Sequence, residues 1–256
     1  MRRLFTYRDL VATLIVRELT VRYKRSTIGF VWTMLQPMLT MVVLHFVFSS
    51  VFRFEVANYP VYVLAGVLFW NFFSQSIISS MNSLRGNASL LKKLPVPHAV
   101  FPVATVIAGV VNLLLAMVPL LVILFFTSHP HRLPPSLLFL PVAILIATVF
   151  TLGAGLLLSP LAVFFYDVVE VVGVVMMLAM YATPIFYPLR IVPEQYRWVV
   201  RYNPVRSILE VFRDPIFFQK VPPLTHLSVA SLVAVIALAL GYWSFRRSAD
   251  RIPFYV

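Results

Sequence analysis

Hydrophobic and polar residues alternate along this chain on the scale of whole helices. Long runs without Asp, Glu, Lys or Arg are separated by short charged segments, and they cover residues 26–52, 56–84, 94–131, 133–166, 171–189 and 221–245. Each run can supply the roughly 20 apolar residues that a helix needs to cross a bilayer. Because lipid offers no hydrogen-bond partner to the backbone, we expect these spans to be helical. The pattern predicts a single all-α membrane domain, residues 1–256, with transmembrane helices at 29–52, 61–83, 103–127, 137–162, 169–189 and 227–245.

Composition supports the membrane class and removes several others. Of the 256 residues, 61% are hydrophobic and 12% are charged, whereas soluble domains carry about 25% charged residues. The absence of cysteine excludes disulfides, thiolate metal sites and thiol catalysis. The net charge of +12 is spread over several segments and not gathered on one soluble face, so we expect contact with membrane lipids and not with nucleic acid.

The distribution of Lys and Arg predicts the orientation in the membrane. The first 30 residues carry seven, the segment after the second span carries three and the C-terminus carries three, while the short loops on the other side hold only Arg53 and Arg132. By the positive-inside rule both termini face the cytoplasm. Segment 190–220 runs against the rule, because it would face outward with six basic residues.

Three segments outside the spans have distinct patterns. Residues 1–25 alternate apolar and charged positions at helical spacing and are predicted to form an amphipathic helix at the membrane interface. Segment 84–100 combines an apolar cluster around Leu91 with Lys92, Lys93 and prolines, as in a partner-docking loop or an ordinary basic inside loop. Segment 190–220 is broken by prolines and rich in aromatics, which predicts short re-entrant helices in the outer leaflet.

Candidate chemistry inside the spans is sparse. The second span is aromatic in its first half and rich in hydroxyl groups in its second half, so it faces other protein or water on one side. Its aromatics either pack in the protein or form a wall for sugar rings, and the residue pattern favours packing. Asp167 and Glu170 fit the start of a helix better than an acid–base pair. His129 and His131 lack a third ligand, so no metal site is predicted.

The sequence also lacks the motifs of an enzyme or a self-powered pump. There is no P-loop, G-x-S-x-G or H-E-x-x-H motif, and the spans contain none of the buried charges typical of ion-coupled transport. If a substance crosses the membrane here, the energy comes from another polypeptide.

Four ordered blocks carry a specific resemblance that covers nearly the whole chain. They read VRYKRSTIGFVWTMLQPML, YVLAGVLFWNFFSQSIISSMNSLRGNASLLKKLPVPHAVFP, VFFYDVVEVVGVVMMLAMYATPIFYP and YNPVRSILEVFRDPIF. In this order and spacing the chain resembles the transmembrane subunits of polysaccharide-exporting ABC transporters, the class that exports O-antigen, teichoic acid and capsule. The resemblance implies a homodimer of six-helix protomers in the bacterial inner membrane. Two copies of a separate ATPase, which holds the ATP and Mg, would power the homodimer.

The resemblance also implies roles for particular residues. The pyrophosphate of a lipid-linked polysaccharide would arrive at the basic end of the first helix, and the family's first, second and fifth spans form the channel wall. The implied residues are Arg22, Tyr23, Lys24 and Arg25 at the entrance; Phe69, Trp70, Phe73, Tyr181 and Phe186 as channel aromatics; Arg85, Asn87, Leu91, Lys92 and Lys93 for ATPase coupling; and Trp198, Tyr202, Asn203 and Pro204 at the outer gate.

One position departs from the family. Its members usually carry an Arg–Asp pair after the fourth span, where this chain has Tyr166–Asp167, so a local ion pair is lost. The function expected from the resemblance is that of a permease for a lipid-linked, O-antigen-like polysaccharide. The alternatives are an ABC permease for another hydrophobic cargo, such as a drug or a lipid, and an intramembrane transferase acting on lipid-linked sugar. The missing catalytic motifs count against the transferase.

Overall fold

The computed structural model describes residues 7–24, 28–29, 31–48, 58–93, 96–127 and 133–255, with only the backbone given for Arg22 and Tyr23. Every regular element in these ranges is helical, which confirms the all-α prediction. The elements are α2 (Arg8–Tyr23), α3 (Val31–Phe46), α4 (Tyr59–Gly86), α5 (Ala88–Lys93), α6 (Val100–Thr127), η2 (Pro135–Phe139), α7 (Leu140–Phe164), α8 (Val168–Ala182), η3 (Leu189–Ile191), η4 (Glu194–Tyr196), α9 (Arg197–Arg201), α10 (Pro204–Arg213), η5 (Asp214–Phe218), α11 (Leu224–Ser248) and α12 (Ile252–Tyr255).

Within the described ranges, four helical segments are long and apolar enough to cross a membrane. They are α4, α6, the continuous run Pro135–Phe164, which joins η2 to α7, and α11. The other two predicted spans correspond to shorter apolar helices, α3 and α8, of 16 and 15 residues. At 1.5 Å per residue these two helices reach only about 22–24 Å, less than the roughly 30 Å of hydrocarbon. The count of six spans therefore stays a prediction.

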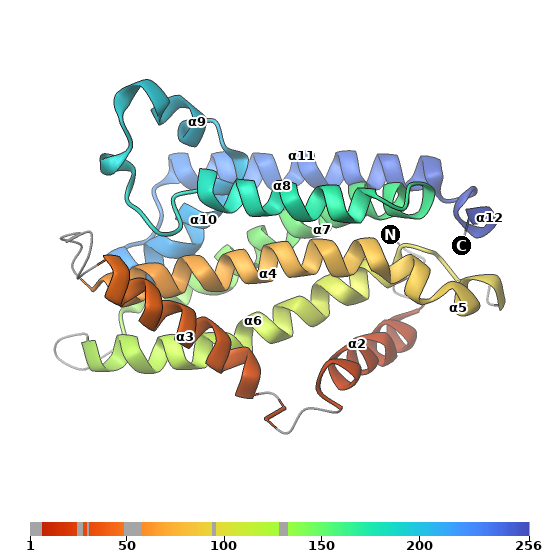
Figure 1. Cartoon of the computed structure of the whole chain (residues 1–256), viewed down its shortest axis with the longest axis horizontal. Helices are drawn as coiled ribbons and strands as arrows, with labels where there is room; N and C mark the ends of the chain where they lie inside the picture. Colours follow the sequence, from red (N-terminus) through yellow and green to blue (C-terminus); the bar gives the residue numbers. More distant parts are fainter. Residues whose placement is uncertain are drawn as a thin grey trace.

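The helices form an elongated bundle with α4 at its centre (Figure 1). α4 packs against α6 and α7, and α7 runs alongside α11. The α7–α11 pair approaches closely because both helices have glycine at the crossing: a Cβ at Gly153 would strike the backbone of α11, and a Cβ at Gly241 would strike Gly153. Small residues permit such close approach between membrane helices.

α8 ends earlier than the sequence predicted. The predicted span reached residue 189, but the helix stops at Ala182, and Thr183 is extended with φ −99° and ψ 137°. Thr183 precedes Pro184, whose ring disfavours helical geometry in the residue before it. The chain then forms an irregular segment, 183–188, against the first turns of α4.

Segment 190–220 is broken into the short elements η3, η4, α9, α10 and η5. α10 is strongly amphipathic: Val205, Ile208, Leu209 and Phe212 are buried. Arg206 and Glu210 form an ion pair at 2.7 Å on its other side. The predicted series of short helices is thus present, and its entry into the outer leaflet stays a prediction.

A second hydrophobic core closes one end of the bundle. It joins α2, the ends of α4, α7 and α11, the start of α6, and the short helices α5 and α12. The residues that form it are Leu14, Leu84, Leu91, Val100, Phe101, Leu156, Val163, Phe245 and Ile252. The N-terminal helix therefore packs on the bundle through Leu14, and α5 is fixed to it through Leu91. The interfacial position predicted for residues 1–25 stays a prediction, and residues 1–6 lie outside the described ranges.

Candidate functional site

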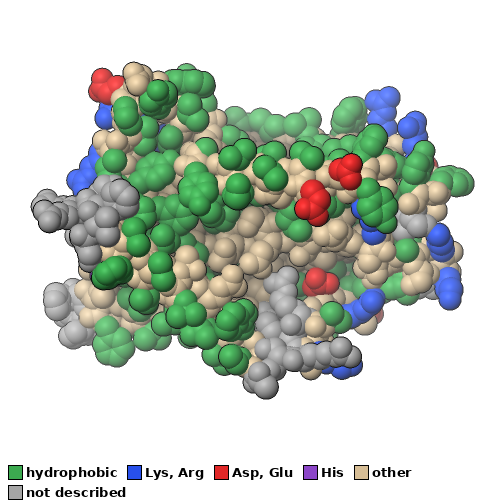
Figure 2. Space-filling model, viewed as in Figure 1, with side chains coloured by type: hydrophobic (Ala, Val, Ile, Leu, Met, Phe, Trp, Pro, Cys, Tyr) green, Lys and Arg blue, Asp and Glu red, His purple; other side chains and the backbone are tan. Residues whose placement is uncertain are grey.

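The most unusual surface of the bundle is a row of uncharged polar side chains along α4. Asn71, Ser74, Gln75, Ser79 and Asn82 recur every three to four residues, so they lie on one side of the helix. We call them the α4 polar strip. Gln75 and Asn82 are exposed and the other three are half-buried. In Figure 2 a pale band, drawn without hydrophobic side chains, follows α4 between green side chains of the neighbouring helices.

A groove of about 420 Å³ follows one side of this strip, between α4 and α8. On the α4 side it is lined by Trp70, Ser74, Gln75, Ile78 and Ser79, and on the α8 side by Gly173, Met176, Met177 and Met180. One wall thus offers hydroxyl and amide groups, and the other offers flexible, polarizable thioether side chains.

The predicted channel aromatics divide into two groups. Phe69 and Phe73 are core residues in this arrangement: they are 0% and 3% exposed, they stack on each other at 6.1 Å between centroids, and Phe73 stacks on Phe150 at 5.3 Å. Side chains covered this completely have no free face for a sugar ring. Packing, the alternative that the residue pattern favoured, therefore describes them.

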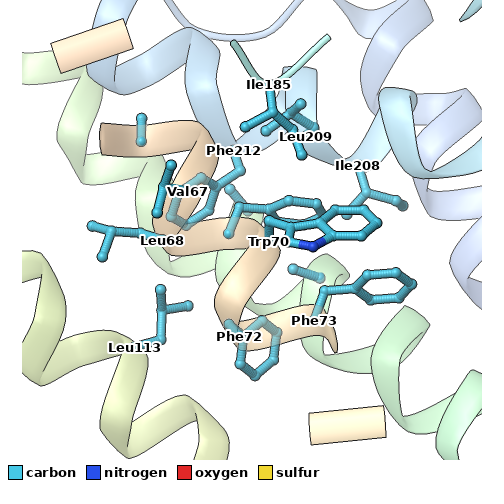
Figure 3. Close-up of a cluster of buried hydrophobic side chains, with 14 of the residues drawn as sticks. Val67, Leu68, Trp70, Phe72, Phe73, Leu113, Ile185, Ile208, Leu209 and Phe212 are labelled. Atoms are coloured by element: carbon cyan, nitrogen blue, oxygen red, sulfur yellow. The ribbon is translucent and has the colours of Figure 1, made fainter. Parts of the chain in front are cut away.

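Trp70 is also nearly covered, but one side of it belongs to the groove. Its ring lies against Phe73 at 5.6 Å, near Ile208 and Leu209 of α10, and it is 5% exposed (Figure 3). Tyr181, by contrast, is 60% exposed on α8, and Phe186 is half-buried 6.3 Å from the Tyr181 ring. Of the five predicted aromatics, Tyr181 has the largest free face.

A buried arginine fixes the segment after α8 to the start of α4. Arg213 donates hydrogen bonds to the carbonyl oxygens of Pro184 at 2.8 Å and Ile185 at 3.0 Å, and its guanidinium lies 3.9 Å from the Tyr62 ring centroid. Gly66 makes room for it, because a Cβ there would collide with the guanidinium. Burial lowers the pKa of Arg213, while the nearby Tyr62 and Glu210 oppose the shift.

Further hydrogen bonds complete this anchor. The Tyr59 hydroxyl donates to the carbonyl of Phe186 at 2.8 Å, and the Tyr62 hydroxyl lies 3.0 Å from the carbonyl of Tyr187. Asn203, predicted at the outer gate, caps α10 by accepting from the amide of Val205 and donates to the Thr183 hydroxyl at 2.9 Å.

The other outer-gate candidates lie on the surface. Pro204 is the first residue of α10, and Trp198 and Tyr202 are 62% and 81% exposed at the end of the bundle where α9 projects (Figure 1). Sequence reasoning missed Arg213 and Tyr62. The one available signal was that Arg213 lies in a segment whose basic residues oppose the positive-inside rule, which indicates that such an arginine has a buried partner.

The predicted coupling residues lie at the other end of the bundle. α4 continues to Gly86 and α5 follows from Ala88, so most of the predicted loop is helical. Leu91 belongs to the second core and is 5% exposed, so it holds α5 on the bundle and is not available to a partner. Lys92 and Lys93 are exposed at the end of α5.

Arg85 and Asn87 connect this end to neighbouring helices. The Arg85 guanidinium lies 3.9 Å from the Tyr166 ring centroid and donates to the carbonyl of Val163 at 3.4 Å. A cation–π contact between Arg85 and Tyr166 is therefore present at the position where family members usually carry the Arg–Asp pair. Asn87 accepts a hydrogen bond from Arg17 at 2.9 Å, which ties α2 to the start of α5. Asp167 is the N-cap residue of α8 but its side chain makes no capping hydrogen bond.

The entrance prediction falls mostly beyond what the structure describes. Lys24 is exposed at the C-cap of α2, in line with the positive residues preferred there. The side chains of Arg22 and Tyr23, and all of Arg25, lie outside the described part of the chain. Among the described residues no group of three or more His, Cys, Asp or Glu could hold a metal ion.

Comparison with known proteins places this architecture in a family. Residues 9–217 match the family described as ABC-2 type transporter. The O-antigen export system permease protein RfbA of Myxococcus xanthus is 30% identical over 239 residues, which is 93% of this chain and 91% of the relative, and the protein of that name from Klebsiella pneumoniae is 29% identical over 93% and 92%. The polysialic acid transport protein KpsM of Escherichia coli is 23% identical over 92% of both chains. The chain belongs to the ABC-2 type transporter family.

Proposed function

We propose that this chain is the permease subunit of an ABC exporter that moves a lipid-linked, O-antigen-like polysaccharide across the inner membrane. The observation that carries the proposal is the α4 polar strip, an uncharged row of hydroxyl and amide groups on the surface of a largely apolar bundle. The relatives named as O-antigen and polysialic acid transporters support the cargo class.

The chemistry of the strip suits a sugar polymer better than a drug or a free lipid. Hydroxyl and amide side chains both donate and accept hydrogen bonds, as sugar hydroxyls do. A row of similar groups at helical spacing offers equivalent positions to successive sugar units. A purely hydrophobic cargo could not form hydrogen bonds with these hydroxyl and amide groups. Each of these side chains would lose its hydrogen-bond partners when such a cargo covered it.

Two copies of the chain form the channel in this proposal. The groove beside α4 is open on one side, and the face of α8 beside it exposes Val174, Val175, Leu178 and Tyr181. A second copy placed symmetrically would close the groove and give a path with polar strips on both sides. The exposed Tyr181 ring, the edge of Trp70 and Phe186 would then be available for stacking with sugar rings.

The energy comes from two copies of a separate ATPase that bind at the α5 end of the bundle. Lys92 and Lys93 are exposed there, and α5 is fixed to α2, α6, α7 and α12 by the second core, so a force on α5 reaches the whole bundle. Both termini face the cytoplasm in this orientation. The pyrophosphate enters beside Arg22, Tyr23, Lys24 and Arg25, and the segment with Trp198 and Tyr202 closes the outer end.

Proteoliposomes test the proposal. We expect the chain and its ATPase together, with ATP, to move a fluorescent lipid-linked glycan across the membrane, while the chain without the ATPase moves none. The same proteoliposomes loaded with a fluorescent phospholipid measure the competing activity. Transport of the phospholipid but not the glycan would contradict the proposal, and so would glycan transport by the chain without its ATPase.

A further inference from the structure

A second polar pocket lies beside the α4 polar strip, on the side away from α8. It is formed by α2, α4 and α6, has a volume of about 260 Å³ and adjoins a smaller cavity of about 70 Å³ that reaches α3. The two share Glu18, Ser79 and Thr105 as lining residues, and we call them together the α2–α4–α6 pocket. Their other polar lining residues are Arg17, Thr33, Gln36, Asn71, Gln75, Ser76, Asn82, Ser83, Asn87 and Asn112.

This pocket contains a buried hydroxyl that the described part of the chain does not satisfy. Ser76 is 3% exposed, lines the smaller cavity, and its Oγ has no hydrogen-bond partner among the described residues. The space for this hydroxyl exists because residue 109 is glycine: a Cβ there would collide with Ser76 Oγ. A buried hydroxyl without a partner is unfavourable, so a ligand that supplied a partner would be favoured.

The lining chemistry excludes some ligands and favours others. Among the polar residues of the wall, neutral hydroxyl and amide side chains predominate, the acid is Glu18, and the arginine, Arg17, donates to Asn87. A phosphate would meet the Glu18 carboxylate here, which repels it. A neutral, hydroxyl-rich group would find donors and acceptors on three helices, and carboxylates accept well from sugar hydroxyls.

The size of the pocket limits the ligand to one unit. The larger part, about 260 Å³, lies just below the roughly 300–1,000 Å³ of pockets for drug-sized ligands. The smaller part, about 70 Å³, has room for roughly two water molecules at about 30 Å³ each, or for one exocyclic group of a sugar. The two parts suit one sugar unit, and the rest of a longer oligosaccharide would extend outside them.

We propose that the α2–α4–α6 pocket binds a single neutral sugar, the unit attached to the lipid pyrophosphate, before the polymer enters the groove along α4. This inference rests on the proposed function and adds the recognition of one sugar unit to it. The geometry agrees with the order of groups in such a cargo: Lys24, a candidate pyrophosphate contact, follows Glu18 by six residues, about 9 Å along α2. Ser79 belongs to both the pocket and the α4–α8 groove, so the sugar has a short path from one to the other.

Binding of matched lipid probes to the full-length chain, assembled with its ATPase in nanodiscs, tests this inference. The probes are a short-chain polyprenyl pyrophosphate without sugar and the same lipid carrying one glucose, one galactose or one N-acetylglucosamine. We expect at least one sugar-bearing probe to bind about tenfold more tightly than the bare lipid, equivalent to about 1.4 kcal/mol.

The variant Ser79→Val/Asn82→Leu removes two polar groups of the pocket. It is expected to abolish the preference while leaving the affinity for the bare lipid unchanged. Thr148→Val is the matched control, because that half-buried hydroxyl bonds within α7, outside the pocket. Ser79→Ala, which removes the hydroxyl and adds no bulk, provides the same comparison if the double variant fails to fold.

Equal affinity of the wild type for all four probes would overturn the inference, as would a preference that survives in the Ser79 and Asn82 variants. A complex that exports glycan but shows no preference overturns the pocket and leaves the proposed function in place. A complex that prefers a sugar-bearing probe but never exports glycan supports the pocket and overturns the proposed function.

Discussion

α4 and α8 flank the same groove, but they are built in opposite ways. Nineteen of the 28 residues of α4 are buried, and much of its remaining surface is the polar strip. In α8 only Val172 is buried, and most of its exposed residues are apolar. In lipid an exposed apolar side chain is ordinary, whereas an exposed amide requires a partner. The comparison therefore places α4 at the centre of the bundle, with the polar strip on which the proposed function rests.

α8 is attached to the bundle chiefly at its two ends. At one end Arg213 and Tyr62 hold the segment after the helix, and at the other Arg85 lies over Tyr166, two residues before the helix begins. Between these points α8 packs on α4 without a buried core of its own. We therefore expect the middle of α8 to be held less firmly than α4.

The largest expected effect is a loss of stability when a core residue of α4 is truncated. Phe69→Ala should lower the free energy of unfolding by about 3–5 kcal/mol, because it leaves a cavity among stacked rings. The matched change on α8, Val175→Ala, should cost less than about 0.5 kcal/mol. Unfolding of the two variants in mixed micelles measures both, and similar costs would show that α8 is as firmly packed as α4.

Removing the buried arginine tests the anchor after α8. Arg213→Met loses two hydrogen bonds from a charged group and should destabilise the protein by about 3 kcal/mol. Arg206→Met on the same helix breaks the Arg206–Glu210 pair near the surface and should cost about 1 kcal/mol. Equal melting temperatures for these variants would contradict the anchor.

The polar strip should matter for transport more than for stability. Replacing Asn71 and Gln75 together with Leu removes hydrogen bonds of about 1 kcal/mol each and should slow ATP-driven glycan export about tenfold. Ser228→Leu on α11, also at a polar position but far from the groove, should leave export unchanged. The unfolding midpoint of each variant is the control, and export at the wild-type rate by the Asn71 and Gln75 variant would remove the strip from the path.

The smallest expected effect lies at the start of α8. A double-mutant cycle of Arg85→Gln and Tyr166→Leu should give a coupling energy of about 0.5–1 kcal/mol, as expected of an exposed cation–π pair. A coupling energy of zero would mean that this end of α8 is not held by Arg85.

The sequence predicted the helical class and the long helices because lipid permits few alternatives to continuous apolar runs. It overestimated α8, since apolarity continues past the point where Pro184 ends the helix. It could not assign Phe69 and Phe73, because the aromatic residues of α4 look alike in sequence, and only packing separates those in the core from Trp70 beside the groove. The polar strip can be seen in the sequence, because Asn71, Gln75 and Ser79 are spaced four residues apart. This spacing is a more specific signal than the number of hydroxyl residues in the second span.

The basic residues of segment 190–220 illustrate a second limit. Counted as loop charges, they oppose the predicted orientation, but in the structure Arg213 is buried against carbonyl oxygens while Arg197 and Arg206 pair with acids. A count by segment cannot distinguish a buried or paired arginine from a free one. That distinction depends on how the folded chain places Tyr62, Gly66 and the segment after α8 around Arg213.

Crosslinking during transport tests the central claim most directly. Because the chain contains no cysteine, an introduced cysteine is the only thiol in it that can carry a label. Gln75→Cys on the polar strip and Leu145→Cys, on an exposed apolar face of α7, each carry the same photoactivatable label in the complex with the ATPase. With ATP and a radiolabelled lipid-linked glycan, the account predicts strong crosslinking of the glycan at residue 75 and little at residue 145. Crosslinking that is equal at the two positions, or stronger at residue 145, would contradict it.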